Sequence, residues 1–156
     1  MNIKIIAVGK IKEKYFDEAI DEFIKRLSGF CSFSITEIPA EAIKDENLAQ
    51  KYMKTEAEKI LAQIKPQSFV ITLEIEGKEL SSIAFAQKIK QWSNEGYSEI
   101  VFVIGGANGL HENIKKISDF KLSMSKMTFP HQIARLNLIE QIYRAFKINN
   151  NEAYHR

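Results

Sequence analysis

Two loops of the sequence carry residues whose types and spacing suit ligand binding. The first, Gly105–Gly109, places adjacent glycines directly after an apolar run, and glycine lets a ligand approach the backbone closely. The second, Ser123–His131, is rich in hydroxyl groups and contains two methionines, so it can hold a purine ring between apolar walls and backbone groups. Each loop also has a plainer interpretation. The first is a tight strand-to-helix turn, and the second is the start of a helix, with Thr128 as N-cap and Pro130 in the first turn.

The glycine loop does not match a common nucleotide-binding motif, and neither do the two glycine–lysine pairs of the sequence. The loop Gly105–Gly109 has the spacing G-G-x-x-G, whereas the dinucleotide-binding fingerprint is G-x-G-x-x-G. The pairs Gly9-Lys10 and Gly77-Lys78 lack the other residues of a phosphate-binding P-loop. The fold, rather than a motif, must therefore indicate which loops bind a ligand.

The last predicted helix, residues 130–148, carries charged residues in two settings. His131 and Arg135 fall inside its apolar arc, and a buried guanidinium is costly unless it is paired. Arg135 must therefore meet a carboxylate, carbonyl groups, a phosphate or a partner subunit, and an internal and an intersubunit ion pair both remain open. Glu140 and Arg144 lie four residues apart on the polar side, where the default expectation is a surface salt bridge.

The spacing of apolar residues predicts five strands that alternate with five helices. The run 100–104 has no polar side chain, so both of its faces should be covered. The predicted strands are 3–8, 33–38, 68–75 (followed by a turn at 76–78), 100–104 and 120–124. The predicted helices are 15–27, 48–64 (closed by Pro66), one capped by Ser81 or Ser82 and ending before Gly96, 112–117 and 130–148.

This order of elements predicts a single α/β domain over residues 1–156, with a mostly parallel sheet and helices on both faces. In such sheets ligands bind outside the carboxyl ends of the strands. The loops that follow Leu73, Ile104 and Met124 are therefore the candidate binding loops, and two of them are the loops already singled out.

The charges are nearly balanced in total but unevenly placed. The chain has 22 basic and 20 acidic side chains, a net charge of +2 that excludes a polybasic arm, an acidic tail and wholesale disorder. Residues 121–156 carry six basic and two acidic side chains, a net of +4, whereas residues 1–120 carry a net of −2. The basic end favours an anionic partner such as RNA, although chance clustering on a solvated surface explains it equally well.

The remaining composition favours a soluble, cytoplasmic protein without a metal. The only cysteine, Cys31, permits no intrachain disulfide and no cysteine-based zinc site, and we expect it to serve packing rather than nucleophilic chemistry. The three histidines show no metal-ligand spacing. The first residues do not have the pattern of a signal peptide, and no apolar run approaches the length of a membrane span.

Taken together, these motifs resemble the SPOUT-class ribosomal RNA large-subunit methyltransferase H family. The resemblance covers the whole chain, and the C-terminal motifs are highly specific in combination. The residues that carry it are Phe102–Leu110, Phe129–His131, Tyr143–Phe146 and Tyr154–Arg156, together with Ala7–Lys10, Glu37–Pro39 and Thr72–Lys78.

The resemblance implies a fold, a cofactor and partners. Members of that family methylate N3 of a pseudouridine in 23S rRNA, are thought to act on assembled ribosomes, and use S-adenosylmethionine as methyl donor. The implied fold has a C-terminal trefoil knot, and the implied assembly is a homodimer whose active site joins both subunits. The cofactor is then expected to contact Leu73, Gly105, Gly106, Met124, Ser125, Lys126, Met127, Thr128 and Phe129.

The implied reaction needs a base, because the imide nitrogen N3 carries a proton at neutral pH. The candidates, in order of preference, are His155, Glu140 and His131. Arginines would position phosphates or offset negative charge on the uracil oxygens, and tyrosines would stack on the extruded base. The candidates for these roles are Arg135, Arg144 and Arg156, and Tyr143 or Tyr154.

Two rival functions account for part of the sequence. A non-catalytic α/β protein that binds RNA or the ribosome would explain the basic end without a use for the two loops. A small-molecule methyltransferase or nucleotide-binding enzyme would explain the loops but would leave the basic tail and Arg135 without a role.

Overall fold

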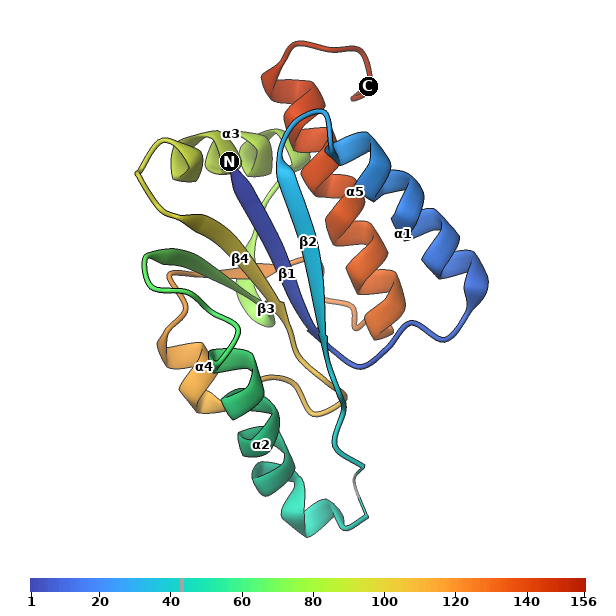
Figure 1. Cartoon of the computed structure of the whole chain (residues 1–156), viewed down its shortest axis with the longest axis vertical. Coiled ribbons are helices and arrows are strands. Elements are labelled where there is room, and N and C mark those ends of the chain that lie inside the picture. The colour runs from blue at the N-terminus through green and yellow to red at the C-terminus, as the bar shows by residue number, and fades with distance from the viewer. Residues whose placement is uncertain (43) are drawn as a thin grey trace.

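Five parallel strands form one sheet in the computed structural model, which describes residues 1–42 and 44–156 (Figure 1). The strands lie in the order β2-β1-β4-β3-β5, and every pairing between neighbours is parallel. Their bounds are β1 Asn2–Val8, β2 Ser32–Ile38, β3 Ser68–Glu79, β4 Glu99–Ile104 and β5 Phe120–Ser123. The predicted α/β class and its parallel sheet are confirmed, whereas the trefoil knot stays a prediction.

Helices cover both faces of the sheet, as the apolar run 100–104 within β4 requires (Figure 1). Successive residues of a strand point to opposite faces. Ile5 and Phe102 accordingly belong to one apolar cluster, and Ile6 and Val103 to the other. The first cluster is covered by α1 Lys14–Leu27, α3 Ser82–Ser93 and α5 His131–Asn149, and the second by α2 Ala49–Leu61 and α4 Glu112–Lys116. A short 3-10 helix, Glu46–Leu48, precedes α2.

Strand β3 is longer than predicted, because the expected turn at 76–78 is an irregularity inside the strand. Leu122 of β5 lies opposite both Leu73 and Lys78, so residues 74–77 form an excursion between two paired segments. A Cβ atom at Gly77 would lie 2.8 Å from backbone atoms of Lys121 and Leu122, which leaves room only for glycine. The excursion carries Glu74 and Ile75 toward the carboxyl edge of the sheet.

The start of α5 differs from the prediction. The helix begins at His131, with Pro130 as N-cap and no side-chain cap, so the prediction that Thr128 is the N-cap is wrong. The expected serine cap of α3 is confirmed, because the Ser81 hydroxyl accepts a hydrogen bond from the Ala84 amide at 3.1 Å. Ile133 lies exposed in the first turn of α5.

Arg135 is buried and forms its ion pair within the chain. It is only 2% exposed, and its Nη1 lies 2.5 Å from the Oε1 atom of Glu37, at the end of β2. Its Nη2 donates to the Gly9 carbonyl oxygen at 3.0 Å, and the Ile11 amide also donates to Glu37 at 3.3 Å. Of the two pairings left open by the sequence, the structure contains the internal one, which ties α5 to the ends of β1 and β2.

Replacement of Glu37 by alanine should destabilise the fold more than replacement of other partly exposed glutamates. The Glu37→Ala variant leaves the buried Arg135 guanidinium with one carbonyl partner, so we expect the free energy of unfolding to fall by about 2 kcal/mol. Glu18→Ala is the control, because the Lys14–Glu18 pair is exposed on both sides and its loss should cost less than about 0.5 kcal/mol. Equal losses in urea unfolding of the two variants would contradict the anchoring role of Arg135.

Candidate active site

The three candidate binding loops line one cavity of about 210 Å³ at the carboxyl edge of the sheet. They follow the first paired segment of β3, the end of β4 and the end of β5, as the topology of a parallel sheet predicts. Of the residues predicted to contact a cofactor, all line this cavity except Lys126, which is exposed. The lining also includes Glu74, Ile75, Ile104, Ala107, Gly109, Leu122, His131 and Ala134.

The first loop is shaped by its glycines. A Cβ atom at Gly105 would lie 2.8 Å from the backbone of Gly109, and Gly109 has a φ of +80°, which favours glycine. The Gly109 amide donates to the Gly106 carbonyl oxygen at 3.0 Å and closes the turn. The loop is therefore a tight turn, as the plainer interpretation held, and that turn is also one wall of the cavity.

The second loop is held by its own hydroxyl groups. The Ser125 hydroxyl accepts a hydrogen bond from the Met127 amide at 2.9 Å, and the Ser123 hydroxyl donates to the Ser125 carbonyl oxygen at 3.1 Å. Met124 and Phe129 are half-buried, whereas the Met127 side chain is 75% exposed. The hydroxyl-rich composition thus fixes the loop so that two apolar side chains turn inward.

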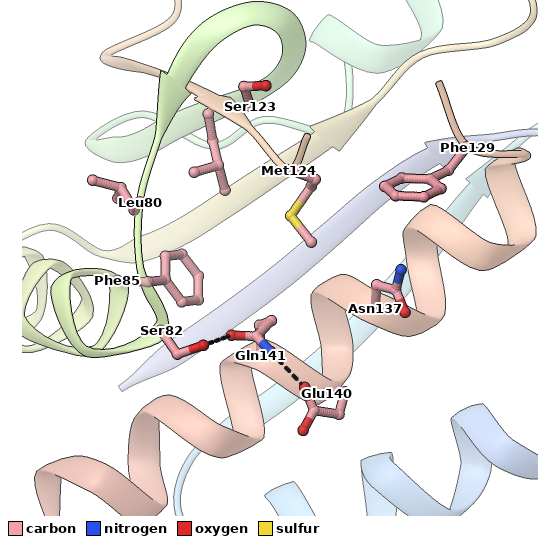
Figure 2. Close-up of a pocket in the computed structure, with 10 residues that line it drawn as sticks. Leu80, Ser82, Phe85, Ser123, Met124, Phe129, Asn137, Glu140 and Gln141 are labelled. Atoms are coloured by element: carbon pink, nitrogen blue, oxygen red, sulfur yellow. Dashed lines mark hydrogen bonds between the residues drawn. The ribbon is translucent and has the colours of Figure 1, made fainter. Parts of the chain in front are cut away.

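A second cavity, of about 390 Å³, adjoins the first and shares Leu122, Met124 and Phe129 with it. Figure 2 shows Met124 projecting toward α5, between Phe85 and Phe129. The polar side of this second cavity is formed by two linked hydrogen bonds. The Ser82 hydroxyl donates to Gln141 Oε1 at 2.7 Å, and Gln141 Nε2 donates to Glu140 Oε2 at 2.7 Å (Figure 2).

This second cavity was not foreseen from the sequence. Its polar residues Ser82, Asn137 and Gln141 come from two helices that only the tertiary packing of α3 against α5 brings together. The one available signal was the polar run around Glu140 on a helix with an otherwise apolar inner face. Glu140, one of the predicted catalytic residues, lines this second cavity and also contacts the C-terminal tail.

The tail folds back onto α5 around Glu140. Glu140 Oε1 accepts hydrogen bonds from Arg144 Nη2 at 2.6 Å and from the Tyr154 hydroxyl at 3.1 Å. The Arg144 guanidinium lies over the Tyr154 ring at 4.7 Å and contacts His155 Nδ1 at 3.3 Å. The Tyr143 ring meets the Tyr154 ring edge-on at 5.0 Å. Five of the eight predicted catalytic residues thus form one group, which we call the tail cluster: Glu140, Tyr143, Arg144, Tyr154 and His155.

The other three predicted catalytic residues lie elsewhere. His131 lines the first cavity, at the N-terminal end of α5. Arg135 is occupied by Glu37 and Gly9 on the side of β1 and β2. Arg156 is exposed at the end of the chain. The sequence therefore selected residues from two separate ends of α5, and the tail cluster gathers only those near its C-terminal end.

Electrostatics holds the tail cluster together at neutral pH. Burial raises the pKa of the Tyr154 phenol, and the nearby Glu140 carboxylate raises that pKa further. The hydrogen bond with Glu140 raises the pKa of Arg144. Both donors therefore keep their protons around pH 7, and the carboxylate between them keeps its partners.

Two other groups have shifted pKa values. Burial raises the pKa of the Cys31 thiol to about 11, so the thiol stays protonated, in keeping with a packing role. Burial also raises the pKa of Glu56, whose Oε2 would lie 3.3 Å from a Cβ atom placed on Gly106. The first loop thus rests against a buried carboxyl group of α2, and this neighbour leaves little room for a side chain at Gly106.

Within residues 1–42 and 44–156, no group of three His, Cys, Asp or Glu residues is placed to hold a metal ion. Within the same ranges, no helix is both long enough and apolar enough to cross a membrane.

In the docked tail, the Tyr154 phenol should titrate at a higher pH than a free tyrosine, because its pKa is raised. Because the folded state favours the neutral phenol of Tyr154, its contribution to tail docking is present up to about pH 10 and is lost as the pH rises through the raised pKa. The absorbance difference at about 295 nm between wild type and Tyr154→Phe isolates this phenol, and we expect its midpoint above pH 10. A midpoint at or below 10 would mean that the tail is not docked in solution.

Comparisons with known proteins agree with this geometry. A family model described as "Predicted SPOUT methyltransferase" matches residues 1–155. The fold is also similar to a solved structure described as a probable methylase family protein from Haemophilus influenzae Rd KW20. That match has a TM-score of 0.57 and 15% sequence identity, and it covers 99% of this chain and 70% of the other. At that identity the likeness concerns the fold alone, but the family match spans nearly every residue, and on that ground this chain belongs to the SPOUT methyltransferase family.

Proposed function

We propose that this protein uses S-adenosylmethionine to methylate N3 of a pseudouridine in 23S rRNA, on assembled ribosomes in the cytoplasm. The single observation that carries the proposal is the cavity shared by the three loops. The loops after β3, β4 and β5 enclose it together, and it adjoins the second cavity, where Glu140 of the tail cluster lies. The specific combination of C-terminal motifs supports the choice of substrate.

The first cavity suits S-adenosylmethionine. Gly105 and Gly106 line the cavity with bare backbone, and a Cβ atom at either position would displace neighbouring atoms. Leu73 and Phe129 supply apolar walls. Such a site, apolar with a few backbone groups, matches an adenine ring. The residues that would hold the cofactor are Leu73, Gly105, Gly106 and 124–129. The bound cofactor would supply an electrophilic methyl group on a sulfonium ion.

The tail cluster supplies the groups that the reaction needs. His155 is the preferred base, because both Glu140 oxygens already accept hydrogen bonds, from Gln141, Arg144 and Tyr154. Arg144 would offset negative charge that develops on the uracil oxygens when the N3 proton leaves. Glu140 then acts as a positioning residue that fixes Arg144 and Tyr154.

The length of α5 favours a homodimer in which the tail serves the partner's cofactor. Arg144, which contacts His155, lies ten residues beyond Ala134, the last α5 residue that lines the first cavity, which is about 15 Å along the helix at 1.5 Å per residue. A methyl group and its acceptor must come within about 3 Å. A second copy can bridge this gap, and the exposed side chains of Ile83 (50%) and Met127 (75%) are apolar surface that it would cover.

The cofactor site can be tested by one extra methyl group in the glycine loop. Wild type should bind S-adenosylmethionine in a calorimetric titration, and Gly105→Ala should bind it at least about tenfold more weakly, because the new Cβ atom displaces the Gly109 backbone. Gly29→Ala is the matched control, since nothing lies closer than 4.0 Å to a Cβ atom there. Absence of binding by wild type would favour the non-catalytic RNA-binding rival.

The reaction can be tested in a strain that lacks this protein. Mass spectrometry of its 23S rRNA should show a pseudouridine that lacks one methyl group, and wild type should restore it. The purified His155→Ala variant should lower kcat by about 10²-fold or more, as expected for a lost general base. His111→Asn is the control, because it keeps an N-cap acceptor for α4 away from the tail cluster.

The outcomes of this experiment separate the alternatives. Binding of S-adenosylmethionine with an unchanged rRNA in the deletion strain would favour a small-molecule methyltransferase. A full rate for His155→Ala would remove His155 as the base and leave Glu140 and then His131 as the next candidates.

A further inference from the structure

A third cleft, of about 530 Å³, lies beside the first cavity and shares His131 with it. Its walls come from three segments: the loop after β1 with Lys10 and Lys12, the loop after β2 with Pro39, and the first turn of α5 with Gln132. All three segments lie at the carboxyl edge of the sheet, where Figure 1 places the start of α5. Neither the sequence motifs nor the cofactor cavity accounts for this cleft.

Hydrogen bonds hold the three walls in place. The Lys12 amide donates to Gln132 Oε1 at 3.2 Å, and this bond joins the loop after β1 to α5. Arg135, which also lines the cleft, donates to Gly9 and Glu37 and so joins α5 to β1 and β2. The cleft is therefore a built part of the fold and not a gap between independent loops.

The charge of the cleft is positive. Lys10 and Lys12 are exposed, and neither forms an ion pair with the part of the chain that the structure describes. No aspartate or glutamate is among its lining residues, and His131 adds a further group that can be cationic. Two unpaired lysines in a cleft with no acidic lining residue are typical of a phosphate contact.

Two backbone and side-chain features add to the positive charge. Helix α5 has 19 residues and begins at the cleft without a side-chain cap, so its first amide groups lack an acceptor and its dipole favours an anion. The Nε atom of the buried Arg135 has no hydrogen-bond partner among the described residues. One N–H group in the wall of the cleft is thus left without an acceptor inside the described part of the chain.

We propose that this cleft binds a backbone phosphate of the RNA substrate, next to the nucleotide whose base is methylated. The inference rests on the proposed function and adds to it a recognition site on β1, β2 and α5, apart from the tail cluster. The shared wall at His131 places the phosphate beside the cofactor cavity. The cofactor's own carboxylate is the other anion that could reach the cleft, but neither lysine lines the first cavity, which we propose as the cofactor site.

The test removes the two lysines. The Lys10→Ala/Lys12→Ala variant should raise the KM for 70S ribosomes about tenfold, while kcat and the Kd for S-adenosylmethionine stay unchanged. The slope of log KM against log salt concentration should fall by about 1 to 2. The matched control is Lys90→Ala/Lys116→Ala, which removes two exposed charges that line none of the cavities described above.

Cosedimentation with 70S ribosomes provides a readout that does not depend on catalysis, and thermal unfolding shows that each variant is folded. A second variant, Lys10→Gln/Lys12→Gln, keeps long side chains and should behave like the double alanine variant. Equal ribosome binding by the cleft and control variants would overturn the inference. A weaker Kd for S-adenosylmethionine would assign the cleft to the cofactor's carboxylate and would also overturn it.

The same experiments separate failure of the inference from failure of the proposed function. If wild type binds ribosomes but does not methylate them, the proposed function fails, and the cleft is still judged by the binding of its variants. If wild type methylates ribosomes and the cleft variants keep its KM, only the inference fails. If wild type neither binds nor methylates ribosomes, both are overturned.

Discussion

The ion pair between Arg135 and Glu37 is the interaction on which the functional part of the molecule depends. It fixes the start of α5 against the ends of β1 and β2, together with the hydrogen bond to Gly9. That start carries His131, which lines both the first cavity and the third cleft. A buried ion pair is a weak source of net stability, but it tolerates only one arrangement of its elements. In this protein the ion pair fixes the position of α5, and the position of α5 in turn places Glu140 in the second cavity.

Local patterns predicted much of the fold and of the lining of the first cavity. The apolar runs of β1 and β4 are visible in the sequence because both strands are buried on both faces, and the rule for the carboxyl ends of parallel strands located the loops at Leu73, Gly105 and Met124. The excursion at 74–77 escaped prediction because it is defined by the pairing of β3 with β5, which lie far apart in the sequence.

Other errors have the same physical origin. Thr128 has the right residue type for an N-cap, but the loop before α5 is held by Ser125, so the helix begins later. The partner of Arg135 lies 98 positions away, and only the parallel pairing of β1 and β2 places Glu37 and Gly9 together beneath α5. Residue types showed that Arg135 needed a partner, whereas the fold determined which partner it has.

In the proposed function, the two ends of α5 contribute to different parts of the reaction. This separation would explain why the tail is docked onto α5. A flexible tail would lose conformational entropy when it met a partner's cofactor, at about 1–2 kcal/mol for each ordered residue. The hydrogen bonds and ring contacts of Glu140, Tyr143 and Arg144 with Tyr154 order the tail within its own chain. His155 is then held in a fixed place within its own chain by its contact with Arg144. In the homodimer proposed above, each chain would contribute a preorganised half of the composite site, and assembly would need only to bring the halves together.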